Sequence, residues 1–308
     1  MWLPAFEAGF RRRRAVGLEI SPGAIRALAL ARSRRRLWIM GAAATPVPTN
    51  ADAAETARAI HATLAQISAN GGAVIGSVGG PAIIIRQLPL PAVQPARILQ
   101  IVDVQRREFG LLPTEEGVLD VQVLKSSREG ASVLAISTPR GLIDARTRLF
   151  EQAAVNLHIL DVEPLALLNA ALNLAALEPD QLLVVADIGE QRTVLCLLSD
   201  RGPVVVRYLD VAAQDPVAVA RIADEIRVSL AFYRSEYDRE SLPRFALSGS
   251  LGTAQLPRAL ATAVGLDAPF EILDPFRVVA TSGLPFALDD AHGGPEFVQA
   301  FGLALRGL

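Results

Sequence analysis

The chain has 308 residues, a formal net charge of −2 and hydrophobic residues at 51% of its positions. This length and apolar content allow a large bilobed core and exclude global disorder. The single cysteine, Cys196, excludes an internal disulfide and a cysteine-based zinc cluster, and the nearly neutral charge balance gives no global electrostatic reason to bind nucleic acid.

The first 14 residues are expected to form a tail outside the first domain. Trp2, Phe6 and Phe10 recur at every fourth position ahead of four consecutive arginines, residues 11–14. The charge follows the apolar residues, which is the reverse of the order in a signal peptide. Two interpretations stay open: a solvated, frayed end, or a short amphipathic segment that touches an anionic membrane surface. No stretch of the sequence has the length and apolarity of a membrane span.

The first part of the chain predicts a hairpin, a third strand, a helix and two more strands, at residues 16–31, 37–44, 49–70, 73–78 and 82–88. The helix has apolar residues at helical spacing, and Asp52 is suited to be its N-cap. The basic turn 32–36, between the second and third strands, is typical of a solvated hairpin tip.

A helix, two strands and a second helix follow, at residues 94–109, 118–124, 133–137 and 142–154. The segment 89–91, Pro-Leu-Pro, interrupts the preceding pattern, so we expect residues 89–155 to form a small inserted α+β subdomain.

After this insert, strands and helices alternate again, at residues 157–162, 164–177, 184–198, 204–211, 216–237, 245–248, 256–264, 270–272 and 297–305. This order predicts an α/β fold with two similar lobes. The first lobe would consist of residues 15–88 and 156–183, and the second of residues 184–308.

Two acid-bearing hairpins, about half a chain apart, are the strongest candidates for a functional site. Residues 184–198 predict a strand, a tight turn and a returning strand, with Asp187 at the strand end and Gly189 in the turn. Residues 16–28 repeat this pattern with Glu19 at the position of the acid. We expect two lobes that face one cleft, in which backbone N–H groups of residues 189–193 bind an anion and Asp187 holds a metal ion through its water shell.

A third turn, formed by Ser248, Gly249, Ser250 and Gly252, lies between a predicted strand and a predicted helix. Such a turn lets the backbone approach a phosphate at the helix N-terminus, although an ordinary strand-to-helix connection has the same composition. Walker and Rossmann spacings do not occur, which disfavours a P-loop or a dinucleotide-binding fold.

The three turns, in this order, resemble those of the actin-like ATPase superfamily, which has a bilobed, ribonuclease H-like fold. Within it the chain resembles the PilM-type proteins of type IV pilus assembly, relatives of the cell-division protein FtsA. The resemblance covers residues 15–308 and also rests on segments 84–89, 119–124, 159–166 and 225–233.

This resemblance implies that ATP with Mg would bind between the lobes. The residues that correspond to its binding motifs are Glu19, Ser21, Gly23, Arg26, Asp187, Gly189, Gln191, Arg192, Thr193, Glu225, Ser248, Gly249, Ser250 and Gly252. Asp187 and Glu19 would hold Mg only if ATP binds. Glu163, which follows the 157–162 strand, is the one candidate for positioning a catalytic water, and the alternative is that it is an ordinary acid at the N-terminus of a helix.

Several positions depart from these motifs. The family has Asp-Ile-Gly-Ser and a lysine where this chain has residues 19–22 and Arg26. Pro22 removes a backbone N–H from the loop that would hold phosphate. Residues 190–191, Glu and Gln, add bulk and negative charge beside the expected anion, a charge that Arg192 would offset. These departures argue against tight ATP binding and more strongly against turnover, which needs a positioned water and stabilised phosphoryl charge.

The resemblance implies a cytoplasmic scaffold, peripheral at the inner membrane, in the assembly platform of a type IV or MSHA-like pilus. Family members bind the N-terminal cytoplasmic peptide of the bitopic protein PilN in a groove between the first subdomain and the insert. The walls of this groove would be residues 83–90 and 94–109, and we expect binding without ATP. Two alternatives stay open: an ATP-hydrolysing actin-like or sugar-kinase-like enzyme, and an FtsA-like protein that self-associates into filaments.

Overall fold

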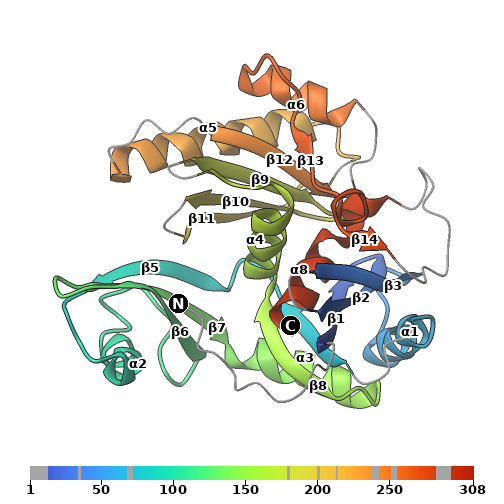
Figure 1. Ribbon diagram of the computed structural model, residues 1–308, viewed down its shortest axis with the longest axis horizontal. Coiled ribbons are helices and arrows are strands. Elements are labelled where there is room, and N and C mark those ends of the chain that lie inside the picture. The colour runs from blue at the N-terminus through green and yellow to red at the C-terminus, as the bar shows by residue number, and fades with distance from the viewer. Residues whose placement is uncertain are drawn as a thin grey trace.

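The computed structural model describes residues 13–33, 36–67, 72–178, 181–199, 202–212, 214–237, 243–250, 255–281 and 293–308. Its strands form three sheets, and its helices cover or separate them (Figure 1). The predicted α/β class with two similar halves and a small insert is confirmed.

The first half of the chain builds most of a six-stranded sheet. In sheet order its strands are β14 (Ala280–Thr281), β3 (Arg36–Pro46), β2 (Ala24–Ser33), β1 (Arg13–Ser21), β4 (Ala73–Val78) and β8 (Leu157–Val162). β1, β2 and β3 run antiparallel to one another, whereas β4 and β8 extend the sheet from β1 in parallel. The predicted hairpin 16–31 is therefore confirmed.

The second half repeats this arrangement. In sheet order its strands are β11 (Gly202–Leu209), β10 (Thr193–Ser199), β9 (Leu182–Ile188), β12 (Pro243–Gly249) and β13 (Glu271–Ile272). They have the order and directions of β3, β2, β1, β4 and β8. The two acid-bearing hairpins thus occupy equivalent central positions in the two sheets.

Two helices form the layer between these sheets. They are α4 (Glu163–Leu174) and α8 (Val298–Arg306), and Figure 1 shows both in the middle of the molecule. Their apolar side chains share one core with the inner faces of both sheets. The outer faces are covered in pairs, by α1 (Ala53–Ala65) with α3 (Arg140–Gln152) and by α5 (Ala218–Tyr237) with α6 (Leu256–Val264).

The insert is a three-stranded antiparallel sheet with one helix. Its strands are, in sheet order, β5 (Ile84–Leu90), β7 (Ala131–Pro139) and β6 (Gly117–Ser126), and its helix is α2 (Pro95–Val104). β5 continues through Pro89, where the sequence predicted a break. An edge strand tolerates proline, because one side of its backbone has no ladder partner.

Three parts of the chain lie in other units than the predicted domain boundaries gave them. α3, which was assigned to the insert, places Phe150 and Ala153 in the core under β1, β2 and α1. β14 and α8 were assigned to the second lobe, but β14 pairs with β3 and α8 packs on β1. Arg13 and Arg14, assigned to the tail, are the first residues of β1. We therefore propose an insert of residues 84–139 and a first lobe that includes residues 298–306.

The remaining helical turns are short. They are α7 (Pro275–Val278) and the 3₁₀ turn η1 (Gly294–Phe297), which leads directly into α8. Asp52 caps α1 as predicted, with a reciprocal contact from Glu55. Among the described residues, no helix has the length and apolar character needed to cross a membrane.

Glycine allows α8 to approach its neighbours at backbone distance. A Cβ atom on Gly17 of β1 would lie 1.9 Å from the carbonyl oxygen of Ala300 in α8. A Cβ atom on Gly302 of α8 would lie 1.8 Å from the carbonyl oxygen of Ala166 in α4. Strand, C-terminal helix and central helix therefore pack with no side chain between them at these two points.

The variant Gly302→Ala tests this packing. The added methyl group meets backbone that has no flexible end to move away, so overpacking is expected to cost about 1–3 kcal/mol and to lower the thermal midpoint by about 3–10 °C. Differential scanning calorimetry measures the midpoint. Gly141→Ala is the matched control, because a Cβ atom at Gly141 has no neighbour within 4 Å, and an equal loss in the control would contradict the prediction.

Candidate functional site

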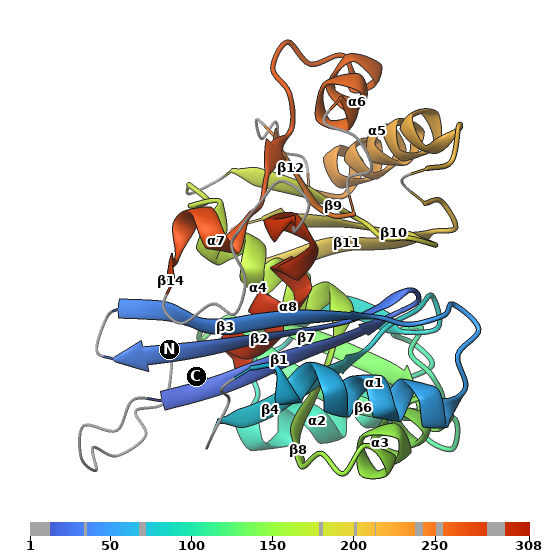
Figure 2. The same ribbon diagram turned by 90° about the vertical axis from the view of Figure 1, so that its right-hand side faces the viewer.

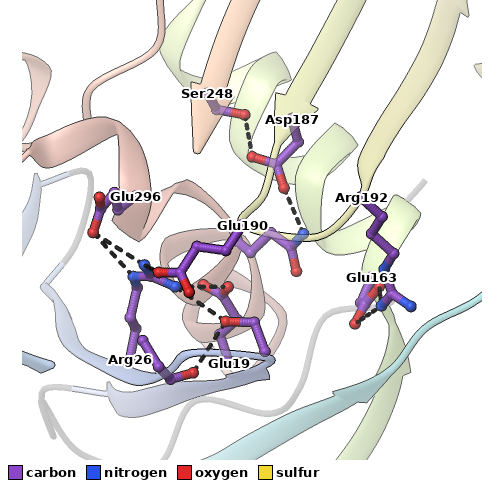
Figure 3. A network of polar contacts seen from close by, with 11 residues as sticks. Glu19, Arg26, Glu163, Asp187, Glu190, Arg192, Ser248 and Glu296 are labelled. Carbon is purple, nitrogen blue, oxygen red and sulfur yellow. Dashed lines mark hydrogen bonds and ion pairs between the residues drawn. The ribbon is translucent and has the colours of Figure 1, made fainter. Parts of the chain in front are cut away.

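The two acid-bearing turns face each other at the boundary between the two sheets (Figure 3). The β1–β2 turn contains Pro22 and Gly23, and the β9–β10 turn contains residues 189–192. Gly23 has a φ of +97°, and a Cβ atom there would lie 1.5 Å from Glu190 Oε2. The glycine therefore provides both the left-handed backbone and the space that the opposing acid occupies.

Arg26 lies at the centre of the contacts between the turns. It stands opposite Glu19 in the β1–β2 register and is 6% exposed. Its Nη1 donates to Ser21 Oγ at 3.1 Å and to Glu19 Oε1 at 3.4 Å. Its Nη2 lies 3.1 Å from Glu296 Oε2 and 3.8 Å from Glu190 Oε1. One buried cation thus connects its own hairpin to the second-half turn and to the C-terminal segment.

Asp187 is the second-last residue of β9, a strand that is buried throughout, and both of its carboxylate oxygens accept hydrogen bonds. Ser248 Oγ donates to Oδ1 at 2.6 Å, and Gln299 Nε2 donates to Oδ2 at 2.6 Å. The side chain is 8% exposed. Through these two hydrogen bonds, the carboxylate connects β9 to the end of β12 and to the start of α8.

Glu163 and Arg192 form a second ion pair. Glu163 is the first residue of α4, and both of its oxygens accept from Arg192 Nη2, at 3.0 and 2.8 Å. The guanidinium group also lies 5.6 Å from the centre of the Tyr208 ring, at a cation–π distance. The prediction that Arg192 offsets the charge of Glu190 is wrong, because Arg192 pairs with the buried acid of α4 and Glu190 faces Arg26 (Figure 3).

Most of the predicted binding residues line one small cavity between the turns. They are Glu19, Ser21, Arg26, Glu163, Asp187, Gly189, Gln191, Arg192, Gly249 and Ser250. Gly23 and Ser248 lie next to it, since each contacts an acid of the lining. Sequence reasoning therefore located the cavity from three separate segments of the chain.

Two predicted binding residues, Thr193 and Glu225, do not line this cavity. Thr193 is fully buried, and its hydroxyl donates to the carbonyl of Val211 at 2.9 Å. Glu225 lies on α5, with its Oε1 3.5 Å from Arg207 Nε. Gly252 lies outside the described residues.

Glu296 and Gln299 line the cavity but were not predicted. Glu296 lies in η1 and Gln299 in the first turn of α8, three residues further along the chain. This spacing was the only feature of the sequence that could have pointed to the two residues. It does not indicate that the C-terminal helix packs against β1 of the first sheet.

The β9–β10 turn is closed on its own backbone. The N–H of Gly189 donates to the carbonyl of Arg192 at 2.8 Å, and the N–H of Ser250 donates to the carbonyl of Ile188 at 2.7 Å. The predicted anion nest at residues 189–193 therefore lacks the Gly189 donor, and the serine-glycine turn is fixed against β9.

Among the described residues, the cavity is smaller than a typical cofactor site. It measures about 50 Å³, which is room for roughly four waters, whereas cofactor sites measure roughly 300–1,000 Å³. Five carboxylates and two guanidinium groups line it, so its walls do not favour a polyphosphate. In the described part of the chain, no cluster of three or more His, Cys, Asp or Glu side chains is arranged to hold a metal ion.

Burial controls the protonation of the site. It raises the pKa of Glu19 to about 7, although the charge of Arg26 acts in the opposite direction. Burial also raises the pKa of Glu163, against the effect of Arg192, and the pKa of Asp187, against the effect of its two hydrogen bonds. The charge of the cavity therefore changes near neutral pH.

Comparison with known proteins identifies the family. The sequence model described as "Type IV pilus assembly protein PilM" matches residues 17–211, which is more than half of the chain. The chain belongs to the PilM family. The matched segment contains both acid-bearing turns and the insert. Among curated protein sequences, none matches this PilM-family chain.

Solved structures show the same fold. A chain from a PilM-PilN type IV pilus biogenesis complex has a TM-score of 0.81 and 24% identity, covering 95% of this chain and 98% of that chain. A Bacteroides thetaiotaomicron protein with an actin-like ATPase fold and unknown function has a TM-score of 0.50 and 11% identity, covering 84% of this chain and 90% of that chain. The actin-like fold predicted for the PilM-family chain is confirmed.

The variant Glu19→Gln tests the protonation of the cavity. The folded state raises the pKa of Glu19 from 4.5 to about 7, so it binds this proton more tightly than the unfolded chain does. The contribution of protonated Glu19 to the free energy of unfolding is therefore fully present below pH 4.5, and it is lost as the pH rises through 7. The wild type should therefore lose on the order of 3 kcal/mol relative to the variant between these values.

Chemical unfolding of both proteins across this pH range measures the difference. Glu129→Gln is the control, because Glu129 is exposed in the β6–β7 turn. A constant difference between wild type and Glu19→Gln would contradict the raised pKa.

Proposed function

We propose that this PilM-family chain is a scaffold of a type IV or MSHA-like pilus assembly platform and binds the N-terminal cytoplasmic peptide of a PilN-like membrane protein. The observation that carries the proposal is the match over 95% of the chain to a subunit of a PilM-PilN complex. The family match over residues 17–211 supports it independently. In this proposal the chain is cytoplasmic and peripheral at the inner membrane.

We further infer that the nucleotide site is degenerate. Arg26, the cation nearest to the expected phosphates, is already surrounded by three carboxylates, and Pro22 provides no N–H donor. Glu163 is held by Arg192 as the buried acid of an ion pair, so we assign it a positioning role in the closed cleft and no catalytic role. The scaffold works without ATP turnover.

Isothermal titration of Mg-ATP into the purified chain tests this inference. No binding heat is expected, because opening the cavity would require breaking buried ion pairs, which costs several kcal/mol. The protein is first gel-filtered in EDTA, and the supernatant of a heat-denatured sample is checked for released nucleotide. Micromolar binding, or nucleotide carried through purification, would restore an ATP-dependent function.

The predicted walls of the partner groove pack against each other. Leu88 and Leu90 of β5 share one core with Ile98 and Val102 of α2. A separate groove of about 770 Å³ lies between α1 and the end of α3, and this volume is within the range of ligand sites. Its lining residues are Asp52, Ala53, Ala54, Ala57, Arg58, His61, Ala62, Gln152, Ala153 and Ala154.

We propose this groove as the docking site of the PilN-like peptide. Its alanines offer a shallow apolar floor for the side chains of a short helical or extended segment, and Arg58 and His61 are exposed for polar contacts. Contacts of this kind need no nucleotide.

The variant Ala62→Trp should block the groove. A large ring in the floor removes the space for the peptide, so the affinity is expected to fall at least about tenfold, which corresponds to 1.4 kcal/mol. Fluorescence anisotropy with a labelled N-terminal peptide of the organism's PilN-like protein measures the affinity, with EDTA and with Mg-ATP.

Ala65→Trp is the matched control, because Ala65 is exposed on the same helix outside the groove. Unchanged affinity of Ala62→Trp would place the peptide elsewhere. If the peptide bound only in the presence of Mg-ATP, the proposal of a scaffold that binds its partner without nucleotide would be contradicted.

A further inference from the structure

Two arginine-rich segments that are separate in the sequence lie side by side in the structure. β1 begins with Arg13 and Arg14, β2 ends just after Arg32, and β3 begins with Arg36. The register places Arg13 opposite Arg32, and Arg36 opposite Ser33. The start of β1, the end of β2 and the start of β3 lie at one end of the sheet (Figure 2). The register therefore brings four arginines, Arg13, Arg14, Arg32 and Arg36, to this end, and we name these four residues the arginine edge.

This arrangement works against the stability of the sheet. Like charges directly opposite on neighbouring strands are destabilising, and Arg13 and Arg32 are such a pair. β1, β2 and β3 contain a single acid, Glu19, which lies at the opposite end of β1 in contact with Arg26. The three strands therefore supply no carboxylate at the edge itself, where Arg13 Nη1 donates to the carbonyl oxygen of Leu308 at 3.2 Å.

The charge is also concentrated relative to the whole chain. Arg13, Arg14 and Arg36 are exposed, and Arg32 is half-buried. In the sequence, segments 11–14 and 32–36 contain eight of the 30 lysines and arginines of a chain whose net charge is −2. A local basic surface on a slightly acidic protein indicates a polyanionic partner at this place.

Apolar side chains lie beside the arginine edge. β14 pairs with β3 at Trp38, which is half-buried. α7, immediately before β14, ends in Val278, which is 57% exposed. Tryptophan next to arginine is typical of residues at a membrane interface, where the ring lies among headgroups.

We propose that the arginine edge binds the anionic phospholipid headgroups of a membrane and orients the PilM-family chain on it. The inference rests on the proposed platform function and assigns a surface to its peripheral membrane contact. Guanidinium groups bind phosphate oxygens in a bidentate manner, and clustered basic residues add their attraction to an anionic leaflet. A basic cluster of this size gives reversible binding, so the partner peptide supplies the second attachment.

Vesicle flotation of the full chain tests the proposal. The vesicles contain phosphatidylcholine alone or equal parts of phosphatidylcholine and phosphatidylglycerol. The chain should float only with the anionic vesicles and should be released in about 1 M salt, where the Debye length is about 3 Å. Reversal of all four charges, in R13E/R14E/R32E/R36E, should lower the bound fraction at least tenfold.

Two further variants distinguish the effect of the arginine edge from the effect of net charge and from the effect of misfolding. R97E/R107E/R128E/R258E makes the same change in net charge at four exposed arginines elsewhere, and it should float like the wild type. R14Q/R36Q neutralises only two exposed positions and should give an intermediate bound fraction. The thermal midpoint of each variant is measured alongside.

Several outcomes would overturn the proposal. These are flotation with neutral vesicles, equal flotation of both charge-reversed variants, absence of binding to anionic vesicles, and displacement of the chain from vesicles by an equal charge concentration of duplex DNA. Peptide capture is measured on the same samples. If capture fails in the wild type while salt-sensitive flotation persists, the proposed PilN-like partner is wrong and the arginine edge stands.

Discussion

The backbone-distance packing of α8 is the constraint on which the candidate site depends. Gly17 and Gly302 allow this helix to lie directly against β1 and α4, and its position between the sheets brings Glu296 and Gln299 to the two turns. Gln299 then holds Asp187, and Glu296 accepts from Arg26. The last helix of the chain thus completes a site whose other parts come from the two halves.

A closed cleft follows from these contacts. Arg26 is buried among carboxylates from three segments, and Arg192 joins the second-half turn to the head of α4. Buried charges that are paired in this way cost several kcal/mol to separate. Among the described residues, these side chains leave a cavity of only about 50 Å³ between the turns.

The proposed surfaces lie on the first half of the chain and its covering helices. The groove between α1 and α3 is uncharged along its alanine floor, whereas the arginine edge carries like charges in adjacent strands. A peptide with apolar side chains suits the first surface, and an anionic lipid leaflet suits the second. Two weak attachments on one rigid lobe would together fix its orientation more strongly than either alone, because the second contact becomes intramolecular.

The sequence by itself determined most of the longer elements, the two similar halves and the segments that line the cavity, but not β14, α7 or η1. Alternating apolar strands, the Asp52 cap and the two acid-bearing turns are patterns of residues close together in the chain, and such patterns can be recognised from the sequence alone. Only the tertiary structure decided which lobe receives α3 and α8, that Arg192 pairs with Glu163, and that the four residues of the arginine edge lie together. These outcomes depend on close packing and strand register between distant segments, which the spacing of residues along the chain does not encode.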